Sequence, residues 1–134
     1  MLLTLYSSLL SYMLFFSLCI APIINLTLDK KNSSKLLRKI FPRNFLYGLI
    51  LSSLVIVCSI YLENKLSLTV SIIIFLLYVI NLYVLIPKIN LEADKSIKNK
   101  GYSKKFKTLH LFSVLIYLIQ MILSFTMIFR IVVF

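Results

Sequence analysis

The sequence is poor in the residues that define several classes of protein. Its 134 residues include two glycines, three prolines and two cysteines, which excludes collagen-like, low-complexity and disulfide-framework chains. Only 14% of the residues are charged, whereas roughly 25% are charged in a typical soluble domain. Just four residues are acidic. A water-soluble globular fold is therefore excluded.

Apolar residues dominate what is present. They make up 60% of the chain, and the mean hydropathy is +0.99. Four long apolar runs cover approximately residues 1–28, 45–62, 66–86 and 108–134. Each run is close to or longer than the roughly 20 residues that cross a hydrocarbon core. Inside lipid no water is available to the backbone N–H and C=O groups, so a spanning segment of this kind must be helical. We predict an all-α membrane protein with a single domain over 1–134, a four-helix transmembrane bundle with up-down-up-down connections.

The first apolar run shares its N-terminal position with secretory signal peptides. No lysine or arginine precedes it, however, and it is longer than the roughly 7 to 15 apolar residues of a signal core. We therefore expect this run to be retained as a membrane span.

Basic residues are concentrated in two of the three connections. Of the 15 lysines and arginines, all but Lys65 and Arg130 lie after the first and third runs. The positive-inside rule places those connections in the cytoplasm and both termini outside, as expected for a multi-pass protein of a bacterial cytoplasmic membrane. We expect the basic residues to contact anionic headgroups of the lipid bilayer, and we expect no nucleic-acid partner.

The basic connections also carry helical signals. After Pro87 no glycine or proline occurs before Gly101, so helix 3 is expected to kink near the proline, extend into the cytoplasm and end at the glycine. Ser103 is the expected N-cap of the fourth helix. In the first connection, residues 35–41 favour a short amphipathic helix that Pro42 ends.

Polar side chains within the runs mark faces expected to turn toward other helices. In the fourth run they recur every three or four residues, at His110, Ser113, Tyr117, Gln120 and Ser124. With the inferred sidedness, Asn25, Asn81 and His110 lie near the cytoplasmic ends of their helices. We predict a candidate polar site of these three with Ser113 and Gln120. Interhelical hydrogen bonding is the simpler explanation of the same residues.

The sequence lacks the usual motifs of catalysis. It has no Gly-rich phosphate loop, no His-Glu-x-x-His pair and no Ser-His-Asp set, and its four acidic residues fall outside the apolar runs. We expect no catalytic residue, metal site or cofactor, and a protein that is not an enzyme. His110, the single histidine, titrates near neutral pH and leaves metal or haem binding open as an alternative.

Short motifs with a recognisable order and spacing run along most of the chain. Their positions are Pro22, Phe41, Pro42, Pro87, Asn90, Asp94, Phe106 and His110. In these motifs the chain resembles the bacterial small integral membrane proteins of the domain of unknown function 4149, which are related to eukaryotic transmembrane protein 205. The resemblance implies four helices and no established activity for the bacterial proteins.

Three functional hypotheses follow. The first is a non-enzymatic membrane protein that associates with a membrane-protein partner or homo-oligomer, or that handles a small solute at the cytosol-facing polar site. The second is a haem- or metal-binding redox protein that uses His110, because the helical layout is also similar to copper-resistance and protoporphyrinogen-oxidase membrane families. The third is a scaffold that binds anionic lipid through the basic connections.

Overall fold

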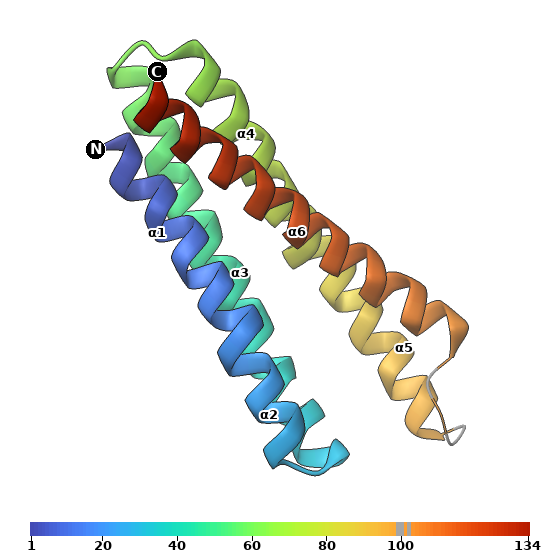
Figure 1. Ribbon diagram of the computed structural model, residues 1–134. Coiled ribbons are helices and arrows are strands. Elements are labelled where there is room, and N and C mark those ends of the chain that lie inside the picture. Colours follow the sequence, from blue (N-terminus) through green and yellow to red (C-terminus); the bar gives the residue numbers. More distant parts are fainter. Residues whose placement is uncertain (99–100, 102) are drawn as a thin grey trace.

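Long helices account for nearly all of the computed structural model, which describes residues 1–98, 101 and 103–134. Four helical segments run side by side in this part of the chain, and consecutive segments point in opposite directions (Figure 1). The elements in chain order are α1 (Leu2–Phe15), η1 (Phe16–Ile20), α2 (Ala21–Thr27), α3 (Lys30–Tyr61), α4 (Lys65–Ile80), η2 (Asn81–Leu85), α5 (Ile86–Lys98) and α6 (Lys104–Val133). The elements η1 and η2 are π-helical stretches within the first and third segments.

All four segments are long and apolar enough to cross a membrane. The candidate spans are Leu2–Thr27, Lys30–Tyr61, Lys65–Ser96 and Lys104–Val133. Large apolar side chains such as Leu18, Val57 and Phe129 stay more than half exposed on the outside of the bundle. Contiguous apolar surface of this kind is unfavourable in water and favourable in lipid. The fold is therefore all-helical with four candidate membrane spans, in agreement with the sequence.

The four segments pack as one bundle that opens toward one end. Helix α3 packs against α1 and α4, and α6 packs against α1 and α4. Figure 1 shows the two termini and the α3–α4 turn together at one end of the bundle. Helices α3 and α6 begin at the opposite end, at Lys30 and Lys104, and this end is called the basic end below. Toward it, α2 and α3 separate from α5 and α6 (Figure 1).

Small and hydroxyl-bearing residues let the helices approach closely away from the basic end. The side chains of Ser59 and Ser67 are buried and share a hydrogen bond of 2.6 Å between α3 and α4. The Tyr6 hydroxyl of α1 lies 3.1 Å from the Ser67 Oγ, which brings a third helix into the same contact. Such bonds between helices satisfy polar groups that have no water to bond inside lipid. Most of the predicted polar face of α6 is buried, at Ser113, Tyr117, Gln120 and Ser124.

Pro42 lies inside a helix and does not end one. Helix α3 is continuous from Lys30 to Tyr61, so the separate short helix predicted over residues 35–41 is wrong. Proline removes one helical hydrogen bond, but the helix continues because the following apolar run must satisfy its own backbone groups. The predicted amphipathic segment is therefore part of a long helix, near its N-terminal end.

The other two prolines follow the π-helical stretches. Pro22 and Pro87 are each the second residue after a stretch, which covers Phe16–Ile20 in one case and Asn81–Leu85 in the other. A proline cannot donate to the carbonyl four residues earlier, and in both cases that carbonyl lies within the stretch. The third segment thus continues through Pro87, as predicted, and carries a π-helical stretch at the expected irregularity.

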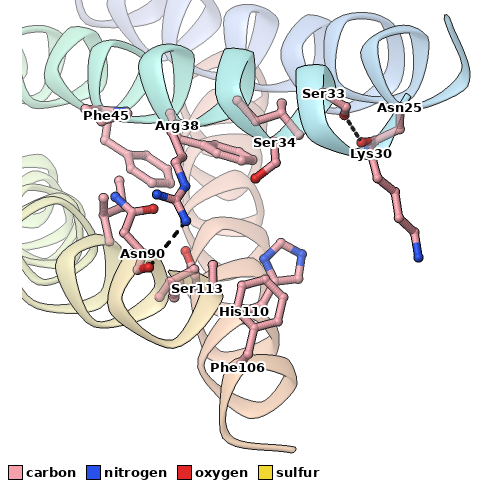
Figure 2. A pocket seen from close by; sticks show the side chains of 16 residues that line it. Asn25, Lys30, Ser33, Ser34, Arg38, Phe45, Asn90, Phe106, His110 and Ser113 are labelled. Atoms are coloured by element: carbon pink, nitrogen blue, oxygen red, sulfur yellow. Dashed lines mark hydrogen bonds between the residues drawn. The ribbon is translucent and has the colours of Figure 1, made fainter. Parts of the chain in front are cut away.

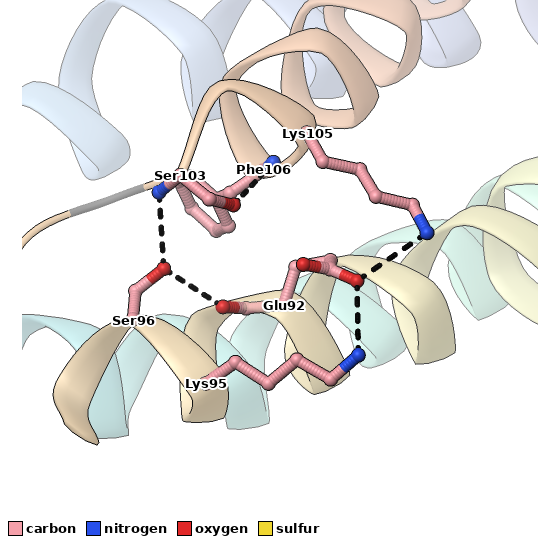
Figure 3. A network of polar contacts seen from close by, with 6 residues as sticks. All are labelled: Glu92, Lys95, Ser96, Ser103, Lys105 and Phe106. Carbon is pink, nitrogen blue, oxygen red and sulfur yellow. Dashed lines mark hydrogen bonds and ion pairs between the residues drawn. The ribbon is translucent and has the colours of Figure 1, made fainter. Parts of the chain in front are cut away.

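A polar network closes the α5–α6 connection at the basic end (Figure 3). The Glu92 carboxylate is buried and lies 3.5 Å from the Lys95 Nζ and 3.6 Å from the Lys105 Nζ. The Ser96 hydroxyl donates to the Glu92 carbonyl and accepts from the Ser103 N–H. These contacts join the last turns of α5 to the first turn of α6.

The ends of the two helices agree with the predicted caps. Ser103 accepts a hydrogen bond from the Phe106 N–H at 3.1 Å, which confirms it as the N-cap of α6. Helix α5 ends at Lys98, and the Gly101 N–H donates to the Ser96 carbonyl at 3.2 Å. The rest of the predicted turn, at residues 99, 100 and 102, lies outside the described residues.

Candidate functional site: a pocket at the basic end

A pocket of about 270 Å³ lies at the basic end, where the two helix pairs diverge. One wall comes from α2 and α3, and the other comes from α5 and α6. Its charged side chains and its imidazole are Lys30, Arg38 and His110. Its neutral polar side chains are Asn25, Ser33, Ser34, Asn90 and Ser113. The pocket therefore combines convergent polar groups with a mainly apolar lining, the usual composition of a small-molecule site.

Arg38 connects the two walls of the pocket. Its guanidinium donates to the Asp94 carboxylate at 2.7 Å and to the Asn90 carbonyl at 3.4 Å, from α3 across to α5 (Figure 2). Asn90 and Asp94 are four residues apart, so both lie on one face of α5. The side chain of Asp94 is 58% exposed and that of Arg38 is 31% exposed. The ion pair is therefore partly screened by solvent and contributes little to stability.

His110 faces the pocket from α6. Its ring lies parallel to that of Phe106, with 6.1 Å between the ring centres and 2° between the planes. Neither imidazole nitrogen has a hydrogen-bond partner among the described residues, and the side chain is exposed. Figure 2 shows His110, Ser34 and Arg38 around a common space. His110 is thus placed to donate to or accept from a bound molecule.

The structure brings together part of the predicted polar site. Asn25, His110 and Ser113 line the pocket, and Asn25 accepts a hydrogen bond of 2.8 Å from Ser33. Asn81 is fully buried behind Ser113, whose hydroxyl donates to the Asn81 Oδ1 at 2.7 Å. Gln120 lies deeper in the bundle and donates to the Ile74 carbonyl at 3.1 Å.

The motif positions gather around the same pocket. Phe41, Pro42, Asn90, Phe106 and His110 line it, and Asp94 holds the guanidinium of Arg38. Pro22 and Pro87 instead follow the π-helical stretches. Six of the eight motif positions therefore meet in one region of the structure.

Sequence reasoning missed the importance of Arg38, Lys30 and Ser34. Arg38 and Lys30 are two among many basic residues of the connections, and their spacing does not separate them from the others. Asp94 was the one available signal, because the atom of Asn90 that accepts from Arg38 is a backbone carbonyl, which any residue would supply. The donor itself comes from another helix and has no sequence signal.

The structure also bears on the metal alternative. Among residues 1–98, 101 and 103–134, no three His, Cys, Asp or Glu side chains are grouped as metal ligands. Cys19 and Cys58 are both free thiols. A metal ion bound at His110 with the usual three or four protein ligands would thus need ligands from beyond these residues or from a second chain.

Comparison with known proteins supports the resemblance seen in the motifs. The family described as a domain of unknown function (DUF4149) matches residues 4–99, which cover the first three helical segments. No curated protein and no solved structure matches the chain significantly. The match covers more than half of the 134 residues and includes the motif positions from Pro22 to Asp94. The chain therefore belongs to the DUF4149 family.

Proposed function

We propose that this protein is a non-enzymatic, multi-pass protein of a bacterial cytoplasmic membrane that binds a small solute in the pocket at its basic end. The observation that carries the proposal is the pocket, in which Asn25, Asn90, His110 and Ser113 converge on one volume. Its volume, about 270 Å³, is just below the roughly 300 to 1,000 Å³ of typical ligand sites. The solute is therefore small.

The direction of access follows from the distribution of charge. Both basic connections lie at the pocket end of the bundle, so the positive-inside rule gives one consistent orientation. The pocket then opens to the cytosol or to the inner leaflet. Both chain termini and the α3–α4 turn lie on the outer side.

A bulky substitution in the pocket tests the proposal. Ser34 lines the pocket and is only partly buried, so Ser34→Trp fills the volume with little change to the core. Leu36→Trp, two residues further along α3, exposed and outside the pocket lining, is the matched control. We expect small molecules extracted from the purified wild type and the control, and measured by mass spectrometry, to be depleted in Ser34→Trp. Equal amounts in all three proteins would contradict the proposal.

The exposed basic residues support a second candidate function, a scaffold at the anionic face of the membrane. Lys31, Lys35 and Lys39 are exposed on the first three turns of α3. Each lysine near an anionic surface contributes about 1 kcal/mol of attraction. For a scaffold, changing all three to Gln should lower the amount of phosphatidylglycerol that co-purifies with the protein. An unchanged lipid content would rule out these lysines as the binding surface.

A further inference from the structure

The pocket combines positive charge with hydrogen-bond donors on its polar side. Arg38 enters from α3 and His110 enters from α6, whereas the Lys30 side chain lines the edge of the pocket and points away from the space between them (Figure 2). The Glu92 carboxylate lies outside the lining and is engaged by Lys95 and Lys105. Asp94 pairs with a single guanidinium nitrogen of Arg38, and Asp29, next to Lys30, accepts a hydrogen bond from the Asn32 side chain. Because a guanidinium has five N–H donors, Arg38 retains donors for a second acid group.

The other side of the pocket is apolar and partly aromatic. Phe41 and Phe45 stack with 6.2 Å between ring centres, and Ile86 and Ile89 face them from α5. A hydrated inorganic anion would leave these side chains in contact with water. A ligand with an apolar body would cover them and gain from their burial.

The size of the pocket suits a ligand with a short apolar body. Its volume of about 270 Å³ lies just below the roughly 300 to 1,000 Å³ of typical ligand sites. This is enough for one acid group and several methylene groups.

We infer that the pocket binds a single-chain anionic amphiphile, with its carboxylate or phosphate held by Arg38 and His110 and its chain lying against Phe41 and Phe45. The inference rests on the proposed binding function and specifies its ligand class. The acid group has two possible sources, a free amphiphile or the headgroup of a single-chain lipid. Both present the same chemistry to the pocket.

The single histidine provides a local test. Protein labelled with ¹⁵N only at histidine gives signals from His110 alone, provided that the affinity tag contains no histidine. The full chain in an uncharged maltoside detergent is titrated separately with decanoate, decyl phosphate and decanoyl lysophosphatidate. Decyltrimethylammonium has the same apolar chain with a positive charge and controls for the sign of the charge. Inorganic phosphate has the negative charge without a chain and controls for the apolar part. We expect a saturable change of the imidazole signals with the anionic amphiphiles and a much smaller change with either control.

Three variants connect that change to Arg38. Arg38→Gln should weaken binding by roughly tenfold, as expected for the loss of a charge-assisted contact. Asp94→Asn should strengthen binding, because it frees the guanidinium from its present partner. Arg43→Gln removes an exposed charge from the same helix outside the pocket and should change nothing. The opposite directions expected for the first two variants separate a binding effect from a loss of folding.

The outcomes separate the ligand class from the binding function itself. A response to lysophosphatidate alone assigns a lipid source, and a response to decanoate or decyl phosphate assigns a free amphiphile. A saturable response to decyltrimethylammonium alone would overturn the inference but leave a binding pocket. Absence of any response, or an effect of Arg43→Gln equal to that of Arg38→Gln, would also overturn the inference. The extraction experiment with Ser34→Trp then decides the proposed function independently.

Discussion

Gly48 is a residue at which α3 lies close to its neighbours. A Cβ atom built there collides with the Tyr12 hydroxyl and with the ring of Tyr78, which are hydrogen-bonded to each other. Both tyrosines belong to the packed interior, and Tyr78 is fully buried. Packing therefore requires a small residue at this position. The backbone conformation does not require glycine, because it is helical and any residue can adopt it.

Gly48→Ala should consequently destabilise the bundle. Overpacking of a tight contact costs about 1–3 kcal/mol, more than the roughly 0.5–1 kcal/mol gained from alanine within a helix. Gly101→Ala is the matched control, because nothing lies within 4 Å of its added Cβ. The measurement is the midpoint of thermal unfolding in detergent. A Gly48→Ala midpoint at or above that of the wild type would contradict the packing described here.

Gln120 illustrates a different balance at the residue scale. Its amide nitrogen donates to the Ile74 carbonyl at 3.1 Å, but its buried Oε1 has no hydrogen-bond partner among the described residues. An unsatisfied buried acceptor costs about 1–3 kcal/mol, whereas one hydrogen bond contributes only about 0.5–1.5 kcal/mol.

Gln120→Met should therefore leave stability unchanged or raise it. Methionine keeps the length of the side chain and removes both polar atoms. The reverse is expected for Ser59→Ala, which removes a hydroxyl that bonds both the Val55 carbonyl and Ser67. Thermal unfolding in the same detergent compares the two variants. A Gln120→Met protein that is less stable than Ser59→Ala would show that the Gln120 oxygen is satisfied in the membrane.

At the scale of elements, the α5–α6 connection depends on a few caps. Ser103 accepts from the Phe106 N–H with its side chain and donates its own N–H to Ser96. Loss of an N-cap hydroxyl costs about 0.5–2 kcal/mol. Ser103→Ala should accordingly loosen the start of α6 and raise the rate of proteolytic cleavage near Lys104. Ser53→Ala, which removes a bond only to the Leu49 carbonyl of its own helix, should leave that rate unchanged. Equal rates in Ser103→Ala and the wild type would count against the cap.

The elements also show how far sequence reasoning reaches. The apolar runs predicted the helices correctly, because a backbone segment that crosses lipid must form its hydrogen bonds within itself. The same reasoning placed the N-cap at Ser103 correctly. It failed at Pro42, because α3 continues through this proline from Lys30 to Tyr61, against the rule that proline ends a helix. The π-helical stretches before Pro22 and Pro87 had no sequence signal beyond the prolines.

For the whole molecule, spacing along each helix located polar faces but not their partners. The stripe on α6 was correct from Ser113 to Ser124, yet only its basic-end residues reach the pocket. Which residues meet depends on how the helix pairs diverge, and that divergence is set by packing between segments remote in sequence. Arg38 is the clearest example, because its contact with Asp94 joins residues 56 positions apart.

The orientation of the bundle is the property on which access to the pocket depends. Lys35 lies at the basic end, and Glu63 lies in the α3–α4 turn at the other end, and both side chains are exposed. In a background with Cys19→Ala and Cys58→Ala, Lys35→Cys and Glu63→Cys form a matched pair of single thiols. A membrane-impermeant maleimide on intact bacterial spheroplasts should label Glu63→Cys and should reach Lys35→Cys only after the membrane is permeabilised. The reason is that translocating a dense basic connection is unfavourable, whereas the turn at Glu63 carries only one lysine. Labelling of Lys35→Cys from outside, with Glu63→Cys protected, would place the pocket on the outer face and reverse the source of any ligand it binds.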